Sequence, residues 1–258
     1  MDPAALVGIA VAFGAIMTSL ILEGSSPMAI FLIPALILVF VGSFGAGLAG
    51  STMPDFIATL TALPRFLTAK IGKPDDAVAS IVSLAERARR EGLLALEEAA
   101  KAVEDPFLKR GLELAIDGTD PDEVADILSA QIAAKSRQDK VYAKLFTDMG
   151  GYSPTIGIIG TVIGLIHVLE NLSEPEKLGE LIAGAFVATL WGVLSANIFW
   201  LPIASRIKKV SELECAGMEL VLEGILAIQA GSNPRNVGQK LRALLPPGSA
   251  SAEAKKAA

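Results

Sequence analysis

Four stretches of this chain contain neither an acidic nor a basic residue: 3–22, 24–54, 149–169 and 181–205. Each reaches or exceeds the roughly 20 apolar residues that a helix needs to cross about 30 Å of hydrocarbon. One such stretch would also suit the buried helix of a large soluble protein, but four together favour a membrane protein. Only 19% of the residues are charged, whereas a soluble domain carries about a quarter. We therefore expect an all-α integral membrane protein with four transmembrane helices.

The first stretch has the length of a signal peptide as well as that of a span. No basic residue precedes it, because Met1-Asp2-Pro3 leads directly into the apolar run. The sequence that follows, residues 23–27, is typical of a tight turn and not of a cleavage site. We interpret residues 3–22 as the first span.

The basic residues predict the orientation of the spans. Of 22 lysines and arginines, 21 lie within residues 55–148 or after residue 205, and only Lys177 lies between the spans of a pair. Because basic loops stay in the cytoplasm, we expect a multi-pass protein of the cytoplasmic membrane with both termini inside. The predicted parts are a transmembrane hairpin (1–54), a cytoplasmic helical domain (55–148), a second hairpin (149–205), and a cytoplasmic helix with a disordered tail (206–258).

The cytoplasmic sequence predicts a series of helices. Capping residues, proline starts and glycine stops place them at about 75–90, 93–103, 107–116, from 121 through 144 into the third span, 211–230 and 236–245. A break at Gly92 lets Arg89 and Arg90 face solvent or a partner. Glu86–Arg90 and Glu97–Lys101 have the spacing of favourable i,i+4 ion pairs. This charge cluster suits a solvated helix surface as well as a binding surface.

Several function classes are excluded by the rarity of certain residues. The single cysteine, Cys215, excludes a disulfide framework, and the single histidine, His167, excludes a multi-histidine metal centre. A net charge of −6 argues against nucleic acid as a partner. There is no P-loop, nucleophile elbow or dinucleotide fingerprint. We predict neither an enzyme nor a bound cofactor or metal.

Within the last two spans, prolines and threonines are the residues of interest. Pro154 and Pro202 lie at the same predicted membrane depth, where each marks a helix end or contributes to a ring of hinges. Thr161 and Thr189 each lie about eight residues inside a span, so both could lie near mid-membrane, where a polar pair could line a water-filled or partner-filled groove. No span holds an Asp, Glu, Lys or Arg. Ion transport needs a titratable or coordinating group in the membrane, so if this chain moves ions, we expect a partner chain to supply the carboxylate.

Several motifs together resemble those of one family. They are RREGLLALE at residues 89–97, GYSPTIGIIGTVIGLI at 151–166, AFVATLWG at 185–192, NIFWLPIA at 197–204 and GSNPR at 231–235. The chain resembles the MotA family of bacterial flagellar stator subunits, which includes PomA and MotP, over nearly its whole length.

This resemblance implies a homopentamer in the bacterial inner membrane around two copies of a MotB-like partner. That partner is a single-span, peptidoglycan-binding subunit whose membrane aspartate carries the ion. Ion flow would turn the ring, and its charged surface would push the rotor switch protein FliG. By position, the resemblance assigns rotor contact to Arg89, Arg90 and Glu97, coupling to Pro154 and Pro202, and the ion path to Thr161 and Thr189. Sodium-type members tend to have two threonines where this chain has Ala188-Thr189, which favours H+ over Na+.

Two other functions are compatible with the spans. An ExbB/TolQ-type energy transducer of the cell envelope would use the same kind of membrane helices, but those relatives resemble three-span proteins with an outside N-terminus. A passive membrane scaffold would explain the glycine-rich helices. It would not require the paired prolines Pro154 and Pro202 or the charged run from Arg89 to Glu97.

Overall fold

The computed structural model describes residues 4–69, 72 and 74–245, and within them every regular element is a helix. The chain divides into two compact units. Unit 1 comprises Met1–Lys70 and Asp139–Val210, and unit 2 comprises Ile71–Gln138 and Ser211–Ala258. The all-α prediction is confirmed for the described residues. The predicted disordered tail at 246–258 lies outside them.

Unit 1 begins with α1 (Ala4–Leu22), a turn and the short 3-10 helix η1 (Pro27–Ile30). The second charge-free stretch is not one helix, because the backbone is extended at Leu32 before a new helix begins at Ile33. Pro34 in its first turn favours a helix start there, since proline fixes φ and has no N–H to donate. This helix continues through α2 (Ile33–Leu36), the π-helix η2 (Ile37–Val41) and α3 (Gly42–Ala49).

A helix that the sequence analysis did not assign follows directly. α4 (Met53–Leu67) begins after Thr52, whose side chain accepts a hydrogen bond from the backbone N–H of Asp55 at 3.3 Å. The same Thr52 hydroxyl donates to the Asp55 carboxylate at 2.9 Å. These bonds satisfy part of the helix terminus and explain the start.

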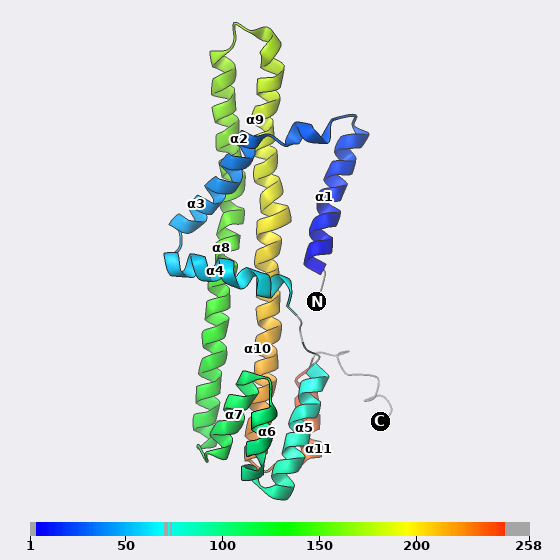
Figure 1. Cartoon of the computed structure of the whole chain (residues 1–258), viewed down its shortest axis with the longest axis vertical. Coiled ribbons are helices and arrows are strands. Elements are labelled where there is room, and N and C mark those ends of the chain that lie inside the picture. Colours follow the sequence, from blue (N-terminus) through cyan, green and yellow to red (C-terminus); the bar gives the residue numbers. More distant parts are fainter. Residues whose placement is uncertain (1–3, 70–71, 73, 246–258) are drawn as a thin grey trace. The chain divides into compact units, whose positions relative to one another are not determined.

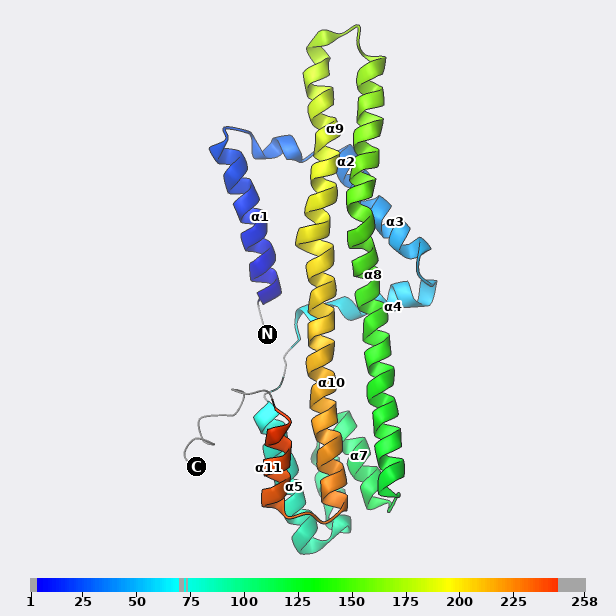
Figure 2. The same cartoon turned by 180° about the vertical axis from the view of Figure 1, so that it is seen from behind.

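The remainder of unit 1 comes from a long helical hairpin. α8 (Pro121–Glu170) runs without interruption through Pro154, and α9 (Pro175–Ser195) returns beside its later part in both views (Figures 1 and 2). The predicted helix from residue 121 into the third charge-free stretch is thus confirmed. α9 continues through the π-helix η4 (Ala196–Trp200) into α10 (Leu201–Gln229). Neither Pro154 nor Pro202 marks a helix end.

Two of the helices are long and apolar enough to cross a membrane: α8 and the continuous helix from Pro175 to Gln229. The helices at Leu6–Leu22 and Ile33–Ala49 are apolar but shorter. In the part of the chain that the structure describes, the protein is therefore all-helical, with two helices of membrane-spanning length and composition.

Unit 2 contains α5 (Pro74–Glu91), η3 (Leu93–Ala95), α6 (Leu96–Ala102), α7 (Pro106–Ile116), α11 (Pro234–Ala243) and the remaining parts of α8 and α10. α5 and α11 lie side by side (Figure 2). One apolar core joins these helices, and its fully buried members include Leu96, Leu112, Leu128, Ile225 and Leu241. The helices predicted at 75–90, 107–116 and 236–245 are confirmed with shifts of one or two residues at their ends; α11, for example, begins at Pro234 because the Asn233 side chain caps it. The helix predicted at 93–103 begins as the 3-10 helix η3, and the one predicted at 211–230 is the later part of α10, which already begins at Leu201.

Candidate functional site

In unit 1, α8 and α9 approach each other along a seam of small residues. A Cβ added to Gly157 would lie 2.8 Å from the carbonyl oxygen of Ala188 and 3.1 Å from the Cα of Gly192. Nearer the end of α8, a Cβ on Gly164 would lie 2.5 Å from the Ala185 Cβ. The seam is therefore closed backbone to backbone, as small residues allow in membrane helices.

Thr161 and Thr189, which the sequence predicts at a similar depth in their spans, meet across this seam. Their hydroxyl groups are hydrogen-bonded to each other. The Thr161 hydroxyl also lies 3.1 Å from the carbonyl oxygen of Ala185, and the Thr189 hydroxyl lies 3.3 Å from that of Gly157. Both side chains are half-buried. The pair thus bridges two helices and still presents part of its polar surface outward.

A second hydroxyl pair in the seam was missed by the sequence analysis. Ser153 and Ser195 are both fully buried, and their Oγ atoms lie 2.5 Å apart. Ser153 precedes Thr161 by eight residues, which places both on one face of α8 because two turns of helix span about seven residues. That spacing was the signal that could have revealed Ser153.

Trp191 was also not singled out from the sequence. Its indole Nε1 donates a hydrogen bond to the Ile30 carbonyl oxygen at 2.6 Å, at the break that precedes α2. The rings of Phe13, Phe31 and Phe40 surround it at centroid distances of 5.7–6.4 Å. Trp191 therefore joins the first helices of unit 1 to α9, two residues from Thr189.

The two predicted coupling prolines differ in their local backbone. Pro154 lies inside a regular α-helix, directly after the buried Ser153. Pro202 follows the π-helix η4, in which the N–H of Leu201 bonds to the carbonyl oxygen of Ala196. Because Pro202 has no N–H for the carbonyl of Ile198, the ordinary α-helical bond is absent at this position. Widened turns of this kind recur at functional sites.

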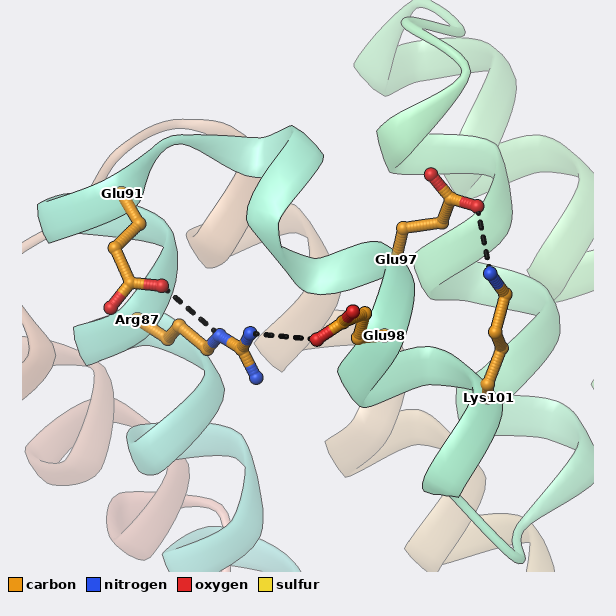
Figure 3. Close-up of polar contacts among 5 residues, drawn as sticks. All are labelled: Arg87, Glu91, Glu97, Glu98 and Lys101. Carbon is orange, nitrogen blue, oxygen red and sulfur yellow. Dashed lines mark hydrogen bonds and ion pairs between the residues drawn. The ribbon is translucent and has the colours of Figure 1, made fainter.

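Unit 2 carries the predicted charge cluster on α5 and α6 (Figure 3). Glu97 Oε1 and Lys101 Nζ lie 3.0 Å apart, so this predicted ion pair is confirmed. The hydrogen bond and negative charge of Glu97 raise the pKa of the Lys101 ammonium above its ordinary value. Residue 92 is a true break, since Gly92 has φ 86°, a backbone conformation that side chains with a Cβ rarely adopt.

The predicted pair Glu86–Arg90 is not formed among the described residues, and the ion pairs at this end of α5 are made by Arg87. Arg87 Nε lies 3.2 Å from Glu91 Oε2, and Arg87 Nη2 lies 3.9 Å from Glu98 Oε2 across the break (Figure 3). Arg87 can bind both carboxylates at once, because its guanidinium group presents several N–H donors in a fork.

Arg89 and Arg90 are exposed, as predicted, and the described residues give neither of them an acidic partner. The cluster therefore presents two available guanidinium groups beside carboxylates that are already paired. Such a surface can bind acidic groups of another protein.

The fold and these sites define an all-helical protein with two helices of membrane-spanning length, whose apolar seam is lined by hydroxyls and, among the described residues, holds no acid. A sequence model of the MotA/TolQ/ExbB proton channel family matches residues 99–220. Motility protein A of Bacillus subtilis is 34% identical over 252 residues, which cover 95% of this chain and 92% of that protein. Chemotaxis protein PomA of Vibrio alginolyticus is 32% identical, covering 94% of both chains.

Solved structures agree. The flagellar MotAB stator complex from Bacillus subtilis contains a chain with a TM-score of 0.87 and 32% identity, covering 95% of this chain and 96% of that one. A C. jejuni MotAB chain has a TM-score of 0.93 at 26% identity, covering 98% and 100%. The chain belongs to the MotA family of flagellar stator subunits.

Proposed function

We propose that this chain conducts ions together with a MotB-like partner and converts their inward flow into torque on the flagellar rotor. The observation that carries the proposal is the hydroxyl pair Thr161–Thr189, which bridges two apolar helices of a MotA-family chain. The charge-free stretches hold no acid that could carry a cation. The partner's membrane aspartate would supply that group.

The proposed assembly is a pentamer of this chain around two copies of the single-span partner in the bacterial inner membrane. Each subunit would cross the membrane four times, with both termini in the cytoplasm. The support is the four charge-free stretches and the position of 21 of 22 basic residues outside the short outer loops. In this topology unit 2 would belong to the cytoplasmic side.

Protons are the proposed coupling ion. Ala188 is buried, and its Cβ would lie 2.6 Å from a Cβ on Gly160. The position that bears a threonine in sodium-type members is thus occupied here by a small, tightly packed apolar residue. Only Thr189 of the two adjacent residues offers a hydroxyl, which supports proton coupling over sodium coupling.

Torque would be delivered through the charge cluster of unit 2. The exposed Arg89 and Arg90 and the exposed Glu97 are the proposed contacts with FliG. The prolines Pro154 and Pro202 would couple ion transfer to helix movement, and the π-helix before Pro202 supports this assignment.

The test is complementation of a bacterium that lacks its own stators, by this chain together with its MotB-like partner. We expect swimming to be restored, to be lost with Arg89→Glu and with Glu97→Lys, and to be reduced by Pro202→Ala while the subunit still inserts into the membrane. Unchanged swimming of both charge-reversal variants would remove the rotor-contact assignment. Failure of the purified chains to form a complex would contradict the stator assignment itself.

A further inference from the structure

The two glutamates of α6, Glu97 and Glu98, form ion pairs with two different basic side chains. Glu97 pairs with Lys101 one turn later in the same helix at 3.0 Å, whereas Glu98 faces Arg87 of α5 (Figure 3). The Glu97 and Lys101 side chains are 65% and 69% exposed, so a partner protein can reach both. Before the rotor protein binds, the Glu97 carboxylate is therefore already paired with Lys101 of the same subunit.

The position of Lys101 favours this engagement. A glutamate four residues before a lysine is the better order for an i,i+4 pair. Lys101 also lies in the last turn of α6, where the helix dipole stabilises a positive charge. The raised pKa of Lys101 agrees with a direct interaction with Glu97.

We propose that Lys101 lowers the affinity of the rotor contact, because it competes within the subunit for the Glu97 carboxylate. The inference rests on the proposed contact between Glu97 and a basic group of the rotor protein. That basic group must either displace Lys101 from the Glu97 carboxylate or share the carboxylate with it. Lys101 thereby weakens the contact and favours its release, which suits a contact that must form and break repeatedly.

The experiment is a double-mutant cycle with the complete stator complex in detergent and purified FliG as the probe. Its four arms are the native chain, Lys101→Met, Glu97→Gln and the double variant. We expect Lys101→Met to tighten FliG binding about two-fold at low salt, the range of an exposed i,i+4 pair. In the Glu97→Gln background the same substitution should have no effect. The difference should vanish at about 1 M salt, where the screening length is about 3 Å.

Two further variants serve as controls. Lys101→Arg keeps a cation in reach of Glu97 and should bind FliG like the native chain. Lys144 forms a comparable i,i+4 pair with Asp148 at 2.5 Å in α8, so Lys144→Met tests for a general effect of removing a paired lysine and should leave affinity unchanged. An unchanged elution profile and unfolding midpoint of each complex would show that folding is intact.

The outcomes separate this inference from the proposed function. If Glu97→Gln weakens binding but Lys101→Met has no effect, or the same effect in both backgrounds, competition by Lys101 is refuted and the rotor contact stands. If Lys101→Met weakens binding, Lys101 is itself a contact, and the inference is again refuted. If Glu97→Gln has no effect, the proposed contact of Glu97 fails, and the inference fails with it.

Discussion

Gly92 sets where α5 ends and therefore which way its last arginines point. Its φ of 86° and ψ of 166° belong to a region that is essentially restricted to glycine, where other residues cost about 1–3 kcal/mol. The break separates α5 from η3 and leaves Arg89 and Arg90 exposed. The charge cluster thus depends on a residue that carries no charge.

We predict that Gly92→Ala lowers the free energy of unfolding of unit 2 by about 1–3 kcal/mol. Gly217→Ala is the matched control, because its Cβ would meet nothing within 4 Å in α10 and alanine favours a helix by about 1 kcal/mol over glycine. Thermal unfolding of the purified complex measures both. Equal midpoints for the two variants would contradict the role of the Gly92 backbone.

Thr189 carries the polar bridge of the seam, so its hydroxyl can be tested apart from its shape. Thr189→Val removes the bond to Thr161 at nearly constant volume, whereas Thr189→Ser keeps it. In membrane helices such interhelical bonds contribute about 0.6 kcal/mol on average and up to about 1.7 kcal/mol. We expect the valine variant to lose stability in that range and to swim slowly, and the serine variant to behave like the native chain.

The control for this prediction is Thr155→Val in the same helix. The exposed Thr155 hydroxyl donates to the Tyr152 carbonyl of its own helix at 2.7 Å and bridges nothing. If Thr155→Val impairs swimming as strongly as Thr189→Val, the bridge between α8 and α9 is not the cause.

At the scale of elements, the contact between α8 and α9 depends on glycines that leave no room for a side chain. We predict that Gly157→Ala separates the two helices, because the new Cβ would lie 2.8 Å from a backbone oxygen that cannot turn aside. Overpacking of this kind costs about 1–3 kcal/mol. The measured quantities are the unfolding midpoint and the yield of complex with the MotB-like partner.

Gly151→Ala provides the comparison for this seam, since its Cβ would meet nothing within 4 Å in the same helix. We expect it to leave the midpoint and the complex unchanged. A loss of complex with Gly151→Ala but not with Gly157→Ala would show that the seam is not the sensitive surface.

The elements differ in how far the sequence predicts them. In unit 2, local signals suffice: the Asp105 and Asn233 side chains cap helices, and Gly92, Gly118 and Gly231 end them with positive φ. The break before α2 was not predicted, although Pro34 is a local signal for it; the hydrogen bond from Trp191 to Ile30 beside it joins residues 161 apart in the chain and leaves no local signal. The similar depth of Thr161 and Thr189 could be predicted from their positions in two spans, whereas their contact and the arrangement of Arg87 with two glutamates required the geometry of the fold.

At the scale of the whole molecule, charge is distributed so that the chain cannot carry an ion by itself. The charge-free stretches contain hydroxyls and no acid, and the paired hydroxyls of Thr161 and Thr189 can donate and accept hydrogen bonds but carry no negative charge that would neutralise a cation. Most of the charged residues lie within residues 55–148 and after residue 205, which the proposed topology places in the cytoplasm. Conduction and torque are therefore properties of the complex.

This distribution predicts the outcome of reconstitution into vesicles. The chain alone should give no proton flux under an imposed pH gradient, and addition of the MotB-like partner should produce one. Replacing the partner's membrane aspartate with asparagine should abolish the flux, because an amide does not ionise and so cannot take up and release a proton as a carboxylate does. Proton flux through vesicles that hold this chain alone would contradict the need for a partner carboxylate.

Cells carrying the complex should swim in sodium-free medium, because the buried Ala188 supports proton coupling. If swimming requires sodium, the coupling ion is Na+ despite the buried Ala188.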